Sequence, residues 1–207
     1  GHFESHGAAK SLRGMKRSHL ERGFSDIAQN FTTFPDGTIA VCRPLNTMPA
    51  GIKGANRGAI CIEHVGDFDI GGDQMSEAHK HCIIALNALL CLKFRLKPTI
   101  DSLVYHHWYD LKSGLRRNGE GNTKSCPGTN FFGGNQVADA QTHFIPLIEN
   151  YLVKIKESIL PVKQQDEHNA TNKQGIVTVN KLNVRKGPGT QFDIVGKLVR
   201  DDHVTVL

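Results

Sequence analysis

Two separate segments of the sequence carry side chains that could bind a metal ion and hydrolyse a bond. Residues 104–110 read V-Y-H-H-W-Y-D, and an apolar, strand-like run at residues 103–105 delivers His106 and His107 to its end. Residues 123–128 read T-K-S-C-P-G and hold Cys126 in a turn. Imidazole and thiolate are the usual protein ligands of zinc, and a catalytic zinc keeps three protein ligands so that water takes the fourth position. This pattern favours a zinc hydrolase.

Each of these residues also has a plainer explanation. A histidine after a strand is often only a polar surface residue, and a single cysteine most often packs as a small buried hydrophobic side chain. Core packing, however, does not call for the Pro127 and Gly128 that follow Cys126. Lys124, two residues before the cysteine, would place a cation beside a bound metal ion. The segment as a whole therefore favours a metal site.

Amphipathic helices and short strands surround these two segments. Apolar residues recur at helical spacing over residues 8–21, 76–94 and 144–159, which predicts three helices. Residues 26–34 and 39–42 flank a P-D-G-T turn and predict a β-hairpin. Because strands and helices are mixed along the chain, we expect an α/β fold in which a central mixed β-sheet is flanked by helices.

A further strand is predicted at residues 59–63, where A-I-C-I-E is apolar on both faces, as in the centre of a sheet. It ends at Glu63, and a carboxylate at the end of a buried strand is either solvated or functional. Residues 44–58 are rich in Gly and Pro and predict a loop that forms one wall of a groove. His79 and His81 are two residues apart on a predicted helix, so we expect both at the surface and not in a metal pair.

Composition along the chain predicts two domains joined by a linker. Residues 1–160 contain all the helices and strands described so far. Residues 161–174 are polar throughout, which is typical of a linker. Residues 175–207 alternate β-branched and polar side chains around a K-G-P-G-T turn. They predict a small all-β module that is too short to be a complete independent barrel.

Overall composition argues against several classes of protein. In 207 residues, 39% hydrophobic and 22% charged, we find no apolar run long enough for a membrane span and no signal-peptide pattern. Five cysteines without paired spacing indicate neither a disulfide framework nor a four-cysteine zinc site. The net charge of +5 suits an anionic polymer, but the charges lack the aromatic interleaving that nucleic acid needs. We therefore expect a monomer that acts on cell wall and not on nucleic acid.

Four motifs, taken in order, resemble a known family. They are D-I-A-Q-N-F-T-T-F-P-D-G-T-I at residues 26–39, G-A-N-R-G-A-I-C-I-E at 54–63, and the two segments that contain His106 and Cys126. Together they resemble the zinc-dependent N-acetylmuramoyl-L-alanine amidases, which include phage amidase lysozymes and peptidoglycan recognition proteins. The resemblance covers residues 8–160 and is more specific than any single motif. In the same way, L-N-V-R-K-G-P-G-T at residues 182–190 resembles the bacterial SH3-like cell-wall-binding module.

The resemblance implies a role for each matching residue. His106 and Cys126 correspond to two ligands of Zn²⁺, and His107 replaces His106 if the strand register differs by one residue. Lys124 corresponds to the lysine that stabilises the oxyanion, and Glu63 to the glutamate that acts as general base. In the groove, the resemblance implies that the substrate contacts are Asn56, Trp108 and Phe131.

This chain departs from the family pattern at two places. Several members carry a catalytic tyrosine where this chain has Gln29, so proton transfer should rest more on Glu63. The family's first zinc histidine lies on a strand before the first helix, in an H-H-T-like motif that this chain lacks. His2 and His6 are the only upstream histidines. We therefore expect that the strand carrying this ligand is missing from the chain, and that His19 is a packing residue.

The implied activity is hydrolysis of the amide bond between N-acetylmuramic acid and L-alanine in peptidoglycan. Such a protein would be secreted to a bacterial cell wall, or encoded by a phage and released at lysis. Two alternatives remain open. The protein could bind peptidoglycan without cutting it, or Cys126 could be a nucleophile that His106 activates, as in cell-wall cysteine peptidases. A position in a C-P-G loop, and not at a helix N-terminus, argues against the nucleophile.

Overall fold

The computed structural model describes residues 7–159, 173–186 and 190–206. The chain forms two compact units, Gly1–Ile159 and Leu160–Leu207, and each is described by itself. The predicted linker falls largely outside the described residues. No helix within the described ranges is long and apolar enough to cross a membrane.

The sheet of the first unit has three short strands, β1 (Phe31–Thr33), β2 (Ile39–Val41) and β3 (Ile62–His64). Their order is β2-β1-β3, with β1 antiparallel to β2 and parallel to β3. The hairpin and the mixed sheet expected from the sequence are both confirmed. In the parallel pair, Thr32 lies opposite Glu63 and Thr33 lies opposite His64.

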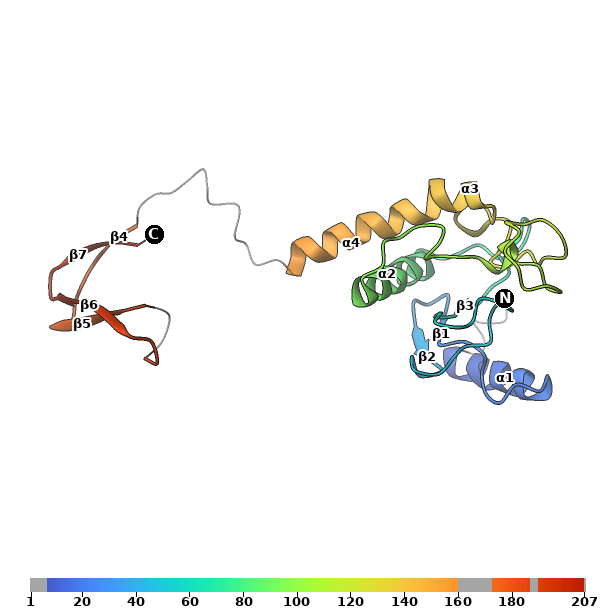
Figure 1. Ribbon diagram of the computed structural model, residues 1–207, viewed down its shortest axis with the longest axis horizontal. Helices are drawn as coiled ribbons and strands as arrows, with labels where there is room; N and C mark the ends of the chain where they lie inside the picture. Colours follow the sequence, from blue (N-terminus) through green and yellow to red (C-terminus); the bar gives the residue numbers. More distant parts are fainter. Residues whose placement is uncertain (1–6, 160–172, 187–189, 207) are drawn as a thin grey trace. The chain divides into compact units, whose positions relative to one another are not determined.

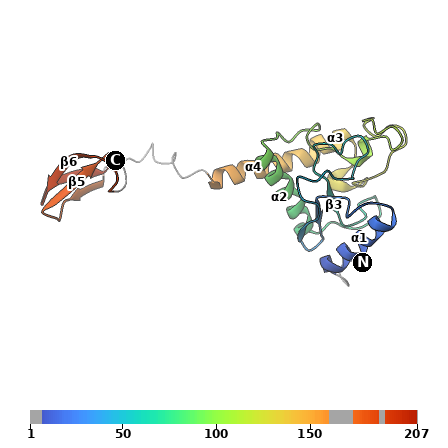
Figure 2. The ribbon, with the colours of Figure 1, turned by 60° about the horizontal axis from the view of Figure 1, so that its bottom comes forward.

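Helices cover the sheet on two sides. Helix α1 (Gly7–Glu21) lies on the side of the sheet away from α4 (Ile145–Ile159), and α2 (Glu77–Phe94) packs against α4 (Figures 1 and 2). Helix α2 begins at the predicted N-cap, because the Ser76 hydroxyl accepts a hydrogen bond from the backbone N–H of His79 at 3.0 Å. The mixed sheet flanked by helices is the fold class expected from the sequence.

The third predicted helix begins earlier than its apolar pattern indicates. A turn of α-helix, α3 (Val137–Asp139), and a π-helical turn, η3 (Ala140–Phe144), lead directly into α4. Gln136 is the N-cap, and its backbone N–H donates to the Asp139 carboxylate at 3.0 Å. The helical segment that ends in α4 therefore begins directly after Gln136.

The strand expected at residues 103–105 is not formed. The chain instead turns into a short 3₁₀ helix, η1 (His106–Trp108), so His106 lies on a tight turn and not at a strand end. Beyond this turn, Tyr109 forms an isolated antiparallel bridge with Arg116. The run is apolar because it packs into the core, where Tyr105 is buried, and not because it forms a strand.

The core of the first unit is aromatic. Trp108 and Phe131 are 0% and 1% exposed, and the Phe131 ring lies 5.5 Å from that of Phe144. A second short 3₁₀ helix, η2 (Phe131–Gly133), presents Phe131 to this cluster. His79 is fully buried, in contrast to the expected surface position, because the first turn of α2 packs it against β1 and the Phe68 ring. His81 is exposed.

The second unit is built from two antiparallel strand pairs. Strand β4 (Lys173–Ile176) pairs with β7 (His203–Val206), and β5 (Lys181–Arg185) pairs with β6 (Ile194–Val199). The described part of this unit contains no helix, in keeping with the alternating sequence pattern. Most of its described apolar side chains remain exposed.

Candidate active site

Glu63 lies in the middle of β3 and is half-buried. Burial raises the pKa of its carboxyl above the ordinary glutamate value. The positive charges of His19, Arg22 and Lys124 oppose this rise in the pKa of Glu63 without cancelling it. A carboxylate with a raised pKa in a partly closed site is a better proton acceptor than an exposed one.

Cys126 lies on the loop that Lys124 opens, and it is close enough to Glu63 for the two groups to interact electrostatically. Burial of the sulfur raises the pKa of the Cys126 thiol, Glu63 raises it further, and Lys124 lowers it. The residue nevertheless keeps an exposed surface. A thiol with a raised pKa is a poor free nucleophile at neutral pH, although a metal ion can deprotonate it.

His106 lies half-buried near the same lysine. Burial lowers the pKa of the His106 imidazole, and the charge of Lys124 lowers it further. The ring is therefore neutral at physiological pH, which is the form that binds a metal ion. Lys124 contributes to the pKa shifts of His106, Glu63 and Cys126. The backbone N–H of His107 donates to the Cys126 carbonyl at 2.8 Å, so the turn of His106 lies beside the loop of Lys124 and Cys126. The four residues are called the electrostatic cluster below.

The imidazole and thiol of this cluster are donor types that zinc prefers, but the cluster supplies only two such ligands. Within the described residues, no group of three His, Cys, Asp or Glu side chains is arranged to hold a metal ion. His106 and Cys126 would supply two ligands, and a catalytic zinc needs a third. His2 and His6, the upstream candidates, lie outside the described residues.

His107, the alternative ligand, has both ring nitrogens engaged by the protein. Nδ1 lies 2.7 Å from the backbone carbonyl oxygen of Lys124, and Nε2 lies 2.9 Å from Nε2 of Gln136. Within the described residues, the His106 ring makes no hydrogen bond of this kind. This contrast favours His106 as the ligand of the pair.

Trp108 and Phe131 were expected to contact substrate in the groove, but the structure buries both of them. Trp108 and Phe131 lie inside the core, and the Trp108 indole donates to the backbone carbonyl of Asn135 at 2.8 Å. Neither ring can form the surface of a groove, because the short 3₁₀ helices that carry them turn both rings inward. Aromatic type alone does not distinguish a core residue from a binding platform.

Asn56 has a defined role within its own loop. Its side-chain oxygen accepts hydrogen bonds from the backbone N–H groups of Gly51 and Ile52, each at 2.9 Å. These bonds shape the loop that was expected to form a groove wall. Contact between Asn56 and substrate stays a prediction, since its amide nitrogen is not used by these two bonds.

Gln29, at the position of the family's tyrosine, is fully buried. Its side-chain amide donates to Thr32 Oγ1 at 2.7 Å, and its side-chain oxygen has no hydrogen-bond partner in the described part of the chain. A closed amide of this kind cannot transfer protons. Proton transfer by Glu63 stays a prediction.

A pair of histidines beside Glu63, His79 buried and His64 partly buried, was not anticipated from the sequence. Thr33 Oγ1 lies 2.7 Å from Nδ1 of His64 and 2.9 Å from Nε2 of His79. Burial lowers the pKa of His64 to about 3 and also lowers the pKa of His79. The position of His64 directly after Glu63 was the only sequence signal, and it becomes informative only once the strand register with Thr33 is known.

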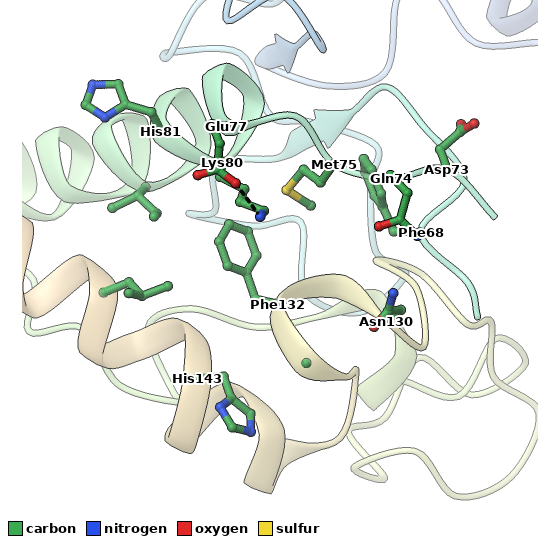
Figure 3. Close-up of a pocket in the computed structure, with 13 residues that line it drawn as sticks. Phe68, Asp73, Gln74, Met75, Glu77, Lys80, His81, Asn130, Phe132 and His143 are labelled. Atoms are coloured by element: carbon green, nitrogen blue, oxygen red, sulfur yellow. Dashed lines mark hydrogen bonds and ion pairs between the residues drawn. The ribbon is translucent and has the colours of Figure 1, made fainter. Parts of the chain in front are cut away.

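A cavity of about 680 Å³ is lined by residues of α2, η2, η3 and α4 (Figure 3). Met75 and Phe132 contribute apolar surface to it, and Lys80, which is paired with Glu77 at 2.6 Å, lies close to the Phe132 ring. None of the four residues of the electrostatic cluster lines this cavity. Asn130 does, so the loop that carries Cys126 reaches the cavity at its far end.

Comparison with known proteins places the chain in a family. The profile of the N-acetylmuramoyl-L-alanine amidase family matches residues 3–129, which is more than half of the chain. The protein therefore belongs to the N-acetylmuramoyl-L-alanine amidase family. No curated protein matches the chain.

Several solved structures are similar to parts of the chain. N-acetylmuramoyl-L-alanine amidase LysC from Clostridium intestinale URNW is 28% identical, with 42% of this chain and 56% of that chain covered and a TM-score of 0.39. The endolysin amidase LysCS from the same organism is 29% identical, with 40% and 53% covered and a TM-score of 0.38. Drosophila PGRP-LB is 25% identical, with 64% and 67% covered and a TM-score of 0.45. The chain thus spans about half the length of the two amidases.

Proposed function

We propose that this protein hydrolyses the amide bond between N-acetylmuramic acid and L-alanine in peptidoglycan, with Zn²⁺ as cofactor. The observation that carries the proposal is the electrostatic cluster of His106, Glu63 and Cys126 around Lys124. Three segments that are far apart in the sequence supply these groups. Membership of the amidase family supports the same bond as the target.

Each residue of the cluster has a distinct task in this proposal. His106 and Cys126 would hold Zn²⁺, which when bound polarises a carbonyl and makes water more acidic. Glu63 takes a proton from the attacking water as its oxygen bonds to the lactyl carbonyl carbon. The Lys124 ammonium faces the oxygen that becomes negative. When the C–N bond breaks, Glu63 returns the proton to the nitrogen of L-alanine, so the products are a carboxylic acid and an amine, which exchange a proton to give a carboxylate and an ammonium group.

A digestion experiment on purified peptidoglycan tests this function. We expect new N-terminal alanine, and no new reducing sugar ends, with one zinc ion per chain and loss of activity in a strong chelator. A zinc-free protein that cuts the same bond at the same rate would contradict the proposed cofactor. Release of any other end group would contradict the proposed bond.

Binding of peptidoglycan without hydrolysis is the second candidate. It is favoured by one observation, the absence of a third metal ligand from the described residues. Sedimentation with insoluble wall material, with no zinc and no released alanine termini, would support it. The cysteine-nucleophile alternative receives no support, because the pKa of Cys126 is raised where an activated thiol needs a lowered one.

We also propose that the second unit holds the enzyme on the wall, as an SH3-like module. Its strand β5 carries part of the motif that resembles this module, and Lys181 and Lys197 are exposed on the paired strands β5 and β6. Exposed cations on this unit suit an anionic polymer.

A further inference from the structure

Three consecutive backbone carbonyls on the catalytic loop are each held by a hydrogen bond. The Lys124 carbonyl lies 2.7 Å from Nδ1 of His107, and the Cys126 carbonyl accepts from the backbone N–H of His107 at 2.8 Å. Between them, the Ser125 carbonyl accepts from Nδ2 of Asn135 at 2.7 Å. The loop has no helix or strand of its own here, so these bonds define the path of its backbone.

The contacts of the His107 ring define which nitrogen carries the proton. A carbonyl oxygen can only accept, so Nδ1 carries the hydrogen and donates to Lys124. Nε2 lies 2.9 Å from the side-chain amide nitrogen of Gln136, which carries hydrogens and donates to it. The same amide donates to the side-chain oxygen of Asn135 at 3.1 Å. The Gln136 amide therefore orients both the His107 ring and the Asn135 side chain.

Asn135 and Gln136 belong to a well-packed part of the fold. Asn135 is 4% exposed, and its backbone carbonyl accepts from the buried Trp108 indole. Gln136 is the N-cap of the continuous helical segment that ends in α4, and α4 packs against α2. The catalytic loop is therefore tied to the helical layer and not only to the sheet that carries Glu63.

The loop of residues 110–122 packs against the His107 ring. Gly119 has a left-handed φ of +101°, and a Cβ atom there would lie 2.7 Å from Nε2 of His107. Asp110 organises this loop by accepting hydrogen bonds from the backbone N–H groups of Ser113 and Asn122, and these bonds lower the pKa of Asp110 to about 2. Only a residue without a side chain fits against the ring at position 119.

We propose that His107, Asn135 and Gln136 form a loop clamp that positions Lys124 and Cys126 for the proposed reaction, and that His107 is a positioning residue and not a zinc ligand. This inference rests on the proposed function. Metal ligands and oxyanion donors need placement to within about 0.5 Å, and a loop reaches that precision only when its backbone is held. The clamp holds the carbonyl of each residue from 124 to 126.

Four variants of the full chain test the clamp. His107→Ala removes both ring contacts, whereas His107→Asn keeps a donor near the Nδ1 position. Asn135→Asp replaces the donor to Ser125 by an oxygen of the same shape. His81→Ala is the matched control, because it removes an exposed histidine from α2.

The readouts are zinc affinity, kcat and KM, and the thiolate-to-metal charge-transfer band of the cobalt-substituted protein. For His107→Ala and Asn135→Asp we expect a loss of about 10- to 100-fold in zinc affinity and in kcat, as for other residues that orient metal ligands. KM should change little, the charge-transfer band should weaken or shift, and His107→Asn should recover most of the loss. The control should match the unaltered protein in every readout.

Two results from the variants would overturn the clamp. One is full zinc affinity, kcat and cobalt spectrum in His107→Ala. The other is complete loss of zinc binding in His107→Ala and His107→Asn alike while His106→Ala still binds it, since His107 would then be the ligand. A third measurement does not depend on zinc. Nitrogen-15 NMR of the metal-free protein should show His107 protonated at Nδ1, and protonation at Nε2 alone would refute the clamp even if the proposed hydrolysis also failed.

Discussion

Lys124 and Glu63 interact across the candidate site, although one lies on an irregular loop and the other in the middle of β3. The charge of Lys124 lowers the pKa of the Glu63 carboxyl, while burial raises it by more. The net effect is a carboxyl that becomes charged at higher pH than an ordinary glutamate. This balance is the basis of the first prediction.

Activity should rise with pH on its acid side as Glu63 loses its proton, since a general base acts in its charged form. The midpoint should lie above the ordinary glutamate pKa. Arg22→Gln should move it to still higher pH, because the charge of Arg22 helps to lower the pKa of Glu63. The pH dependence of kcat/KM measures both effects. An acid limb that is unchanged in this variant would mean that another group is the base.

Glu63→Gln should lower kcat by about 10²- to 10⁴-fold, the usual contribution of a general base. Zinc affinity should stay within a few-fold of the unaltered protein, because Glu63 is not a proposed ligand. Metal titration and turnover of a soluble muropeptide measure the two properties separately. If the variant turned over at the normal rate, Glu63 would have no part in proton transfer.

Cys126→Ser should abolish both zinc binding and wall lysis, because a hydroxyl is a far weaker zinc ligand than a thiolate. Cys42→Ala is the matched control, since Cys42 is partly buried and lies next to β2. Metal analysis and turbidity of a wall suspension are the measurements. Retention of both properties in Cys126→Ser would remove the metal site from the proposal.

Folding stability should fall as the pH drops from about 6.5 toward 3, because His64 is neutral in the folded protein with a pKa of about 3. In this window the unfolded chain binds a proton that the native state excludes, so each unit of pH costs up to about 1.4 kcal/mol for this histidine. Urea unfolding at several pH values measures the slope. His64→Gln should flatten it, and an equally steep slope in that variant would assign the effect to other groups.

Lys181→Glu combined with Lys197→Glu should weaken binding to insoluble wall material, with a larger difference at low salt than at high salt. Hydrolysis of a soluble muropeptide should be unchanged, because both residues belong to the second unit. Cosedimentation at two salt concentrations is the measurement. Equal binding of the variant and the unaltered protein would argue against an electrostatic wall-binding role for this surface.

The comparison of sequence and structure shows where local patterns suffice. Apolar spacing identified α1 and α2 to within a residue or two, because a helix buries one face and repeats along its own sequence. The Pro-Asp-Gly turn likewise identified the β1–β2 hairpin. The pattern at residues 103–105 misled, because a run that is buried on all sides looks the same whether or not a neighbouring strand is present to pair with it.

The sequence alone determined the family, and it supplied the four residues of the proposed site, namely His106, Cys126, Lys124 and Glu63. Only the tertiary structure decided how the other residues are used. It buried Trp108, Phe131 and His79, and it placed Nδ1 of His107 against the loop that carries Cys126 and Nε2 against Gln136. The physical reason is that these outcomes depend on packing between segments distant in sequence, whereas spacing along the chain reports only the local environment of each residue.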